Sequence, residues 1–463
     1  MLSQDMIERI LDRASEKGAD FAEVFEEERI QQETQITQDE IEECQNAKEC
    51  GIGIRLFKDK TRYYAYTNNR SEEAIFQLVS DLTKAMKGDC MARQRLQEKK
   101  IYKMGSETQV VSNKSLKERI APARRAVAAG MSQDEIVRMR VKLTDMEQLV
   151  QIANTEGVYV QDNRVKTRLY IAAYAQNGTD VQSGYYGPGA MRGHEYYDQI
   201  DVEAVAREAA RAAKVILHAK PCRGGQMPVV VANGFGGLLF HEACGHSLES
   251  TVIARGSSEF CGLLGKKVAS DVVTLVDDGS IAGEWGSLHV DDEGTPTQKN
   301  VLIENGILKS YMVDKLDGLR AGLKPTGSAR RQNYRHYPVA RMTNTYIAPG
   351  KSTPEEIISS TEKGIYVKSI NGGSVDPSTG DFNFNASECY MIQNGKLSEP
   401  VRGVTLIGNG GTILKAVDQN SQKYRTQNNL YYRNYHCPEG YLYPGSGEYI
   451  HQKWLQSVPQ ELM

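Results

Sequence analysis

Two histidines and a glutamate near the middle of the chain are the residues best suited to metal chemistry. Glu242 directly follows His241, and His246 comes five residues after His241. Two imidazoles that hold one ion beside a free carboxylate are the core of the common zinc-peptidase motif, in which the histidines are four residues apart. The pattern therefore suggests a metal-dependent hydrolase with one extra residue between its ligands. The whole segment reads His241-Glu242-Ala243-Cys244-Gly245-His246.

The five-residue spacing constrains the backbone that carries the two histidines. On a straight α-helix, five residues turn through about 500°, which leaves the two imidazoles roughly 140° apart. A π-type turn has about 4.4 residues per rotation and brings the fifth residue back close to the first. We therefore expect a distorted helix between His241 and His246, with Gly245 where the distortion costs least.

A buried helix whose histidine and glutamate are only hydrogen-bonded is the competing interpretation of this segment. The chain contains a second His-Glu pair, His194-Glu195, with no further histidine four or five residues later. We interpret that second pair as structural. Spacing alone leaves the metal site and the buried helix about equally favoured at His241, and other residues have to decide between them.

The remaining parts of a catalytic zinc site must come from elsewhere in the chain. Such a site needs three protein ligands and one open position for water. Glu242 can serve as general base for the metal-activated water, because it lies beside a ligand without being one. Cys244 lies inside the motif but points off the face of the two histidines. The ligating imidazoles need hydrogen-bond acceptors, for which the segment 291–293 (Asp291, Asp292 and Glu293) offers candidates. Candidates for the third ligand are His289, His336, His436 and Cys437.

Patterns on either side of the motif predict the elements that position it. Beyond Lys220-Pro221, short β-like runs alternate with turn residues, and one helix leads into His241. Pro122 is expected to limit or kink the helix in which it lies. Helices are expected to begin after the capping residues Ser3, Ser71, Ser115 and Asp201. Strands are expected at 21–27, 52–56, 137–143, 158–160 and 169–175.

These patterns predict an α+β protein in two parts. Residues 1–220 are expected to form an α/β region with an antiparallel sheet and helices, including a linker near 91–110. Residues 221–463 are expected to form a mainly β domain that carries one distorted metal-binding helix. The chain has 463 residues, which is long enough for each part to bury its own core.

Composition excludes several classes of partner. The net charge of −3 gives no reason to expect a nucleic acid or an anionic membrane. No stretch approaches the ~20 apolar residues that a membrane-spanning helix needs. The eight cysteines are scattered and include no C-x-x-C pair, so reduced thiols and a cytoplasmic location are expected.

Several segments of the sequence together resemble one known family. The motif at 241–246, preceded by Asn233-Gly234-Phe235-Gly236-Gly237, is similar to the TldD side of the TldD/PmbA (TldE) metalloprotease family, also known as modulators of DNA gyrase. The resemblance extends over about residues 1–415. Further segments that carry it are Gly18–Val24, Asp291–Pro296, Arg341–Thr345, Gly364–Ser369, Glu399–Gly403 and Leu406–Gly410.

The resemblance implies a cytoplasmic zinc (Zn2+) metalloprotease that acts on small or unfolded polypeptides. It assigns the metal ligands to His241, His246 and the C-terminal Cys437, and the general base to Glu242. It also implies a dimer, either with a second copy or with a PmbA/TldE-like paralogue that lacks the motif. The tail departs from the family pattern, because Cys437-Pro438-Glu439-Gly440 has lost the family's Gly-Lys pair. A catalytically weak or inactive peptide-binding scaffold subunit is therefore the alternative expectation.

Overall fold

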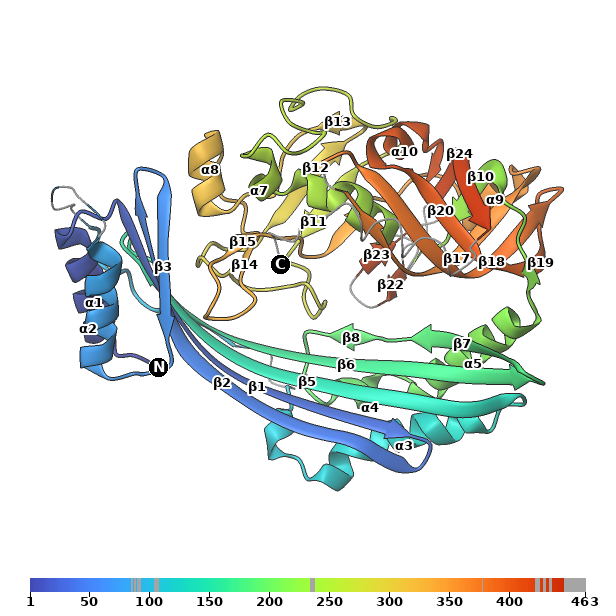
Figure 1. Ribbon diagram of the computed structural model, residues 1–463, viewed down its shortest axis with the longest axis horizontal. Helices are drawn as coiled ribbons and strands as arrows, with labels where there is room; N and C mark the ends of the chain where they lie inside the picture. The colour runs from blue at the N-terminus through green and yellow to red at the C-terminus, as the bar shows by residue number, and fades with distance from the viewer. Residues whose placement is uncertain are drawn as a thin grey trace.

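The computed structural model describes residues 1–444 except 85, 87–88, 90–92, 104–107, 234–237, 377, 421–424, 428–429 and 433–434, and describes the backbone alone from 425 onward. Helices and largely antiparallel sheets are both prominent (Figure 1), which confirms the predicted α+β class. No helix among the described residues is long and apolar enough to cross a membrane.

The first sheet is built on two long hairpins, β1 (Phe21–Thr37) with β2 (Glu40–Lys58) and β5 (Ile136–Asn154) with β6 (Tyr159–Asn177). β1 also pairs with β5, so the four strands form one curved sheet that runs beneath the second half of the chain (Figure 1). Shorter strands extend this sheet: β3 (Thr61–Thr67), β4 (Lys100–Tyr102), β7 (Asp180–Tyr186) and β8 (Gly189–Ala190).

The long strands extend well beyond their predicted bounds. The segment Gln31–Thr37 of β1 is mostly polar on both faces, so apolar alternation could not indicate a strand there. Pairing with β2 and β5 over the whole length satisfies its backbone instead. In β5 the predicted half-buried strand is confirmed at Met139, Val141 and Leu143. Val137 is exposed because the register shifts at the start of β5.

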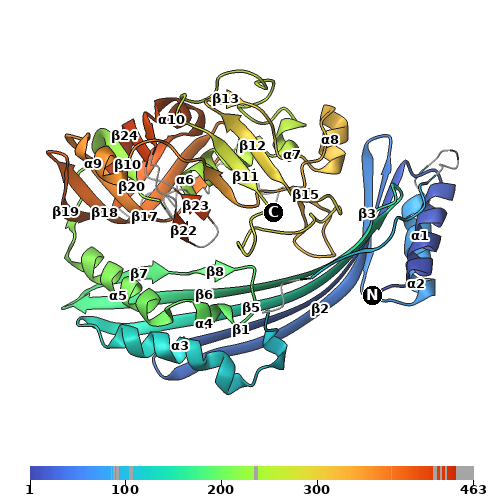
Figure 2. The ribbon, with the colours of Figure 1, turned by 180° about the vertical axis from the view of Figure 1, so that it is seen from behind.

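Helices cover the outer side of this sheet in two groups (Figure 2). α1 (Gln4–Glu16) and α2 (Glu72–Thr83) pack at one end, and α3 (Leu116–Met131) and α5 (Val202–His218) pack at the other. Two short helices precede the second group: η1 (Val111–Asn113) comes before α3, and α4 (Tyr196–Gln199) comes before α5. Each predicted cap accepts a hydrogen bond from a first-turn amide, and the caps are Ser3, Ser71, Ser115 and Asp201.

Pro122 does not end the helix in which it lies. α3 continues from Leu116 to Met131, so the expectation that Pro122 limits this helix is wrong. Pro122 removes one backbone hydrogen bond, but Ala123, Ala126 and Val127 after it are buried against the sheet and α5. The tertiary packing of these side chains outweighs the missing bond.

A ring of strands forms the core of the second half. β10 (Gly225–Val231) pairs with β17 (Lys363–Val375) and β24 (Tyr435–Pro444), and β20 (Val404–Asn409) pairs with β24 and β18 (Asp381–Gln393). The pairing of β17 with β18 closes the ring. β19 (Lys396–Arg402), β9 (Lys220–Pro221) and β21 (Gln419–Asn420) attach to it.

A smaller sheet and short elements complete the second half. The small sheet comprises β11 (Leu275–Asp278), β12 (Lys299–Glu304), β13 (Ile307–Leu308) and β16 (Thr345–Ile347). Two-stranded pairs are β14 (Ala329–Arg330) with β15 (Val339–Ala340), and β22 (Arg425–Gln427) with β23 (Leu430–Tyr432). The helices are α7 (Ser250–Ile253), α8 (Lys315–Ala321), α9 (Pro354–Ser359) and α10 (Gly410–Ala416).

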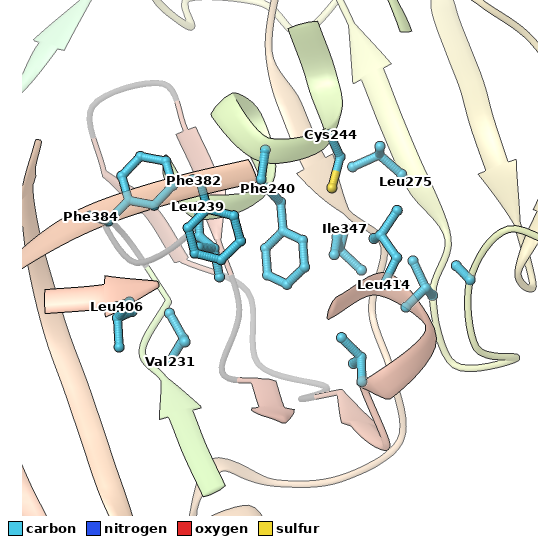
Figure 3. Close-up of a cluster of buried hydrophobic side chains, with 14 of the residues drawn as sticks. Val231, Leu239, Phe240, Cys244, Leu275, Ile347, Phe382, Phe384, Leu406 and Leu414 are labelled. Carbon is cyan, nitrogen blue, oxygen red and sulfur yellow. The ribbon is translucent and has the colours of Figure 1, made fainter. Parts of the chain in front are cut away.

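The helix that carries the motif is anchored by its apolar face. It comprises α6 (Leu238–Phe240), the π turn η3 (His241–Gly245) and η4 (His246–Leu248). Figure 3 shows Phe240 and Cys244 pointing from this helix into the core, among side chains of the ring and of α10. Because Cys244 is fully buried in this core, it lies away from the two histidines, as the spacing predicted.

Buried ion pairs join the first sheet to the second half of the chain. Arg55 of β2 lies between Glu23 of β1 and Glu293, and all three side chains are fully buried. Arg331 also contacts Glu23. These pairs fix the 291–293 segment against the first sheet.

Candidate metal centre

The motif helix is distorted where the histidine spacing predicted. From His241 to Gly245 the backbone forms a π turn, and the amide of His246 donates to the carbonyl of His241, five residues earlier. This turn brings the two imidazoles together, with ring centroids 5.3 Å apart and planes at 90°. The π-type distortion is confirmed, and it turns a spacing that a straight helix could not use into a shared face.

Gly245 serves packing more than backbone freedom. Its φ of −59° and ψ of −51° are ordinary helical values that any residue can adopt. A Cβ added at Gly245 would lie 2.2 Å from Sδ of the buried Met342. The close approach of Met342 therefore favours glycine at this position, whereas the backbone angles of Gly245 give no sign that it eases the distortion.

His241, Glu242 and His246 form a compact donor cluster. One ligand atom from each of these residues lies within 4.8 Å of the others. Nε2 of His246 is 3.4 Å from Oε2 of Glu242, and the buried Nδ1 of His241 has no hydrogen-bond partner among the described residues. An unpaired buried ring nitrogen beside a second imidazole and a carboxylate fits a divalent transition-metal ion.

The electrostatics of the cluster keep His241 in the form that binds metals. Burial, with the neighbouring His246 and Arg330, lowers the pKa of His241 to about 3. The ring is therefore neutral at physiological pH and offers a lone pair.

Glu249 is the carboxylate that orients His246. Its Oε1 lies 2.9 Å from Nδ1 of His246, and its Oε2 accepts a hydrogen bond of 2.5 Å from Arg341. Glu249 is almost fully buried, so the imidazole, carboxylate and guanidinium form one fixed chain. This contact directs Nε2 of His246 toward Glu242. The sequence held a signal for Glu249, because it follows His246 by three residues and directly follows the short helical segment His246–Leu248.

The predicted acceptors at 291–293 lie elsewhere, so that expectation is wrong. Asp291 accepts backbone amides of its own turn and of Ala329. Asp292 and Glu293 bind buried arginines from the first sheet. Asp292 and Glu293 therefore join the halves of the chain, and a run of acids in the sequence could not reveal that their partners are arginines more than a hundred residues away.

The other candidates for the third ligand have different surroundings. Nδ1 of His289 is 2.8 Å from Asp162, and Nδ1 of His336 is 2.8 Å from Asn333. Neither histidine joins the donor cluster among the described residues. His436 and Cys437 lie on β24, where Cys437 is in register with Val229 of β10. Their side chains lie outside the described part of the chain.

The predicted structural pair His194-Glu195 is buried in the first half. The Glu195 carboxylate accepts the backbone amides of Gly193 and Gln109, and the His194 ring packs edge-on against Tyr197. These contacts match a structural role.

A cavity of about 240 Å³ opens beside His241 and His246. Lys166 and Arg168 of β6 line this cavity together with residues of the second half, so the cavity lies between the first sheet and the second half of the chain. Burial, with the charges of Arg164 and Arg330, lowers the pKa of Lys166 to about 8. Sequence patterns did not point to these two basic residues, because an i, i+2 pair of cations on a strand is normally a solvated face. The remaining lining residues are Trp285, Gly286, Leu288, Gly327, Ser328, Ala329, Arg330, Arg341, Met342 and Thr343.

Comparisons with known proteins agree with this geometry. Three family models match: PmbA/TldA metallopeptidase domain 1 at residues 22–86, the central domain at 110–217 and the C-terminal domain at 224–442. The metalloprotease TldD homolog of Buchnera aphidicola (subspecies Acyrthosiphon pisum) is 33% identical over 88% of this chain and 86% of its own length. The homolog of Haemophilus influenzae is 32% identical over 91% of this chain and 89% of its own length.

Solved structures share the fold. The Thermotoga maritima protein TM0727 superposes with a TM-score of 0.82 at 19% identity, over 95% of this chain and all of its own. TldE from Thermococcus kodakarensis gives 0.74 at 20% identity, over 94% of this chain and 99% of its own. The fold, the donor cluster and the named relatives define a metallopeptidase. The chain belongs to the PmbA/TldD metallopeptidase family, as the sequence motifs indicated.

Proposed function

We propose that this chain is a zinc-dependent metalloprotease that hydrolyses peptide bonds in small or unfolded polypeptides. His241, His246 and Cys437 would hold the zinc ion, and Glu242 would act as general base. The observation that carries the proposal is the π turn, because it gathers two imidazoles and a carboxylate within 4.8 Å of one another, and both imidazoles line a cavity. A cytoplasmic location and a dimer are parts of the same proposal.

Each residue of the proposed site has a separate chemical role. Bound zinc supplies a Lewis acid that polarises the scissile carbonyl and acidifies water. Glu242 accepts the proton of the attacking water and delivers it to the leaving nitrogen, so that the nitrogen departs as an amine rather than as an amide anion. Glu249 holds His246 in one tautomer, and Arg341 holds Glu249. Removing Glu242 should therefore remove proton transfer without removing a ligand.

Support for Cys437 comes from its place on the ring of strands. β24 pairs with β10, and Val229 of β10 belongs to the same core cluster as Phe240, the residue before His241. The fold of this chain is similar to that of TldE, and this likeness of fold supports the proposal of a dimer partner that lacks the motif.

The test is metal analysis joined to peptide hydrolysis. The purified chain should contain zinc and should lose activity with a chelator and regain it with zinc. Glu242→Gln should keep the zinc and lower the rate by about 10²–10⁴-fold. Glu304→Gln, at an exposed strand end, is the matched control and should change neither quantity. If the chain contains no zinc and its activity is unchanged by Glu242→Gln and by a chelator, the proposed peptidase function is refuted. Binding of peptides without cleavage would favour the scaffold subunit.

Cys437→Ser separates the third ligand from the rest of the site. We expect this variant to lose most of its zinc while keeping its circular dichroism spectrum. Full zinc content in Cys437→Ser would mean that the third ligand is another residue.

A further inference from the structure

The lining of the cavity beside His241 and His246 is strongly basic. No described aspartate or glutamate lines it, although the chain as a whole has a net charge of −3. Of its basic side chains, only Arg341 forms an ion pair with a carboxylate in the described part of the chain, through Glu249. The basic side chains are Lys166, Arg168, Arg330 and Arg341.

Lys166 and Arg168 are held in place without being neutralised. They are two residues apart on β6, so they project from the same face of the sheet. The ring of Trp285 lies 5.5 Å from Nζ of Lys166 and 5.7 Å from Cζ of Arg168. Such cation–π contacts fix the position of both side chains and leave their charge available.

The carboxylates whose charge acts on Lys166 are already engaged. Asp162 and Asp292, the two acids whose charge acts on Lys166, both bind the buried Arg164. A cavity with several cations and no carboxylate of its own favours an anion from outside, because partial burial strengthens the attraction.

We propose that this basic cavity binds a carboxylate of the peptide substrate next to the scissile bond, so that the chain prefers acidic peptides. The inference rests on the proposed peptidase function, since the cavity adjoins the donor cluster. Lysine and arginine form charge-assisted hydrogen bonds with a carboxylate, and a neutral peptide would leave partly desolvated cations unpaired. A peptide can present this group from an Asp or Glu side chain or from its C-terminus.

Binding to the zinc-loaded Glu242→Gln variant tests the inference without cleavage. Three fluorescent peptides of equal length are compared by anisotropy: one with an internal Glu and an amidated end, one with Gln and a free C-terminus, and one with Gln and an amidated end. At least one acidic peptide should bind about tenfold or more tightly than the neutral peptide, and the tighter one identifies the source of the carboxylate. Equal affinity for all three would overturn the inference.

Charge-removing substitutions locate the preference. Adding Lys166→Met or Arg168→Met to Glu242→Gln should bring the affinity ratio toward one. Lys142→Met is the matched control, because Lys142 lies on the neighbouring strand β5, is paired with Glu33 and does not line the cavity. A ratio that survives both cavity substitutions would contradict a role for this lining.

The same assay distinguishes this inference from the proposed function. If the unsubstituted chain cleaves no peptide while Glu242→Gln still prefers an acidic peptide in a Lys166-dependent way, the basic cavity is supported and the peptidase is refuted. If the chain cleaves acidic and neutral peptides with equal kcat/KM and binds them equally, the peptidase stands and the carboxylate preference fails.

Discussion

The contact between Gly245 and Met342 makes a sharp prediction about the π turn. In Gly245→Ala the new Cβ would lie 2.2 Å from Sδ of Met342 and 3.1 Å from its Cε. The 2.2 Å contact forces the side chain of Met342 to move, whereas the 3.1 Å contact is only tight. Because Met342 is only 3% exposed, its side chain cannot swing into solvent. It has to move toward the cavity that it lines beside His241 and His246.

The expected magnitude follows from this overlap. Overpacking a buried site by one methyl group costs about 1–3 kcal/mol of unfolding free energy. The backbone of Gly245 is already helical, so no further strain is added and alanine's better helix propensity returns about 1 kcal/mol at most. We therefore expect Gly245→Ala to destabilise the chain by up to about 2 kcal/mol and to weaken zinc binding, since the π turn carries both histidines.

A double-mutant cycle in urea unfolding measures the effect. Met342→Ala alone should cost about 2–5 kcal/mol, because it opens a cavity. In the double variant each change should relieve the other, so the combined loss should be smaller than the sum by about 0.5–2 kcal/mol. Additive losses, or a Gly245→Ala variant as stable as the parent with unchanged zinc affinity, would refute the argument that Met342 dictates the glycine.

Two further predictions concern buried charged groups: Arg55, which joins the halves of the chain, and Asp314, which hydrogen-bonds Ser250 within the second half. Arg55→Met leaves Glu23 and Glu293 buried without their shared cation and should cost about 3–5 kcal/mol in urea unfolding. Arg9→Met removes an exposed pair and should leave the free energy of unfolding nearly unchanged, so equal losses in the two variants would contradict the account. Burial, with the charge of Glu293, raises the pKa of Asp314 to about 7, against about 3.9 in an unfolded chain. The unfolded state therefore loses this proton first, so stability should fall as pH rises from about 4 to about 7, and Asp314→Asn should flatten that fall in urea unfolding; an unaltered pH profile would count against it.

Local chemistry predicted much of the secondary structure. Helix starts at Ser3, Ser71, Ser115 and Asp201 depend on a side chain and an amide three residues later, and the structure has all four caps. The polar ends of the long hairpins were missed, because neighbouring strands rather than apolar alternation define them. Pro122 shows the same effect in a helix, where packing overrides a local preference.

The sequence by itself determined the distortion of the helix between His241 and His246. A spacing of five between His241 and His246 requires a π turn if both residues are to face one ion, and that requirement is purely local. The two-part domain boundary, the zinc ion and the role of Cys437 remain predictions from the sequence.

Only the tertiary structure decided which residues surround the donor cluster. Glu249 rather than 291–293 orients His246, because the acidic run is taken by arginines of a distant sheet. Met342 explains Gly245, and Lys166 comes to the cavity from β6, seventy-five residues before His241. Apart from the local contact between His246 and Glu249, these contacts join segments that are far apart in the chain, so they depend on how the sheets pack rather than on any local pattern.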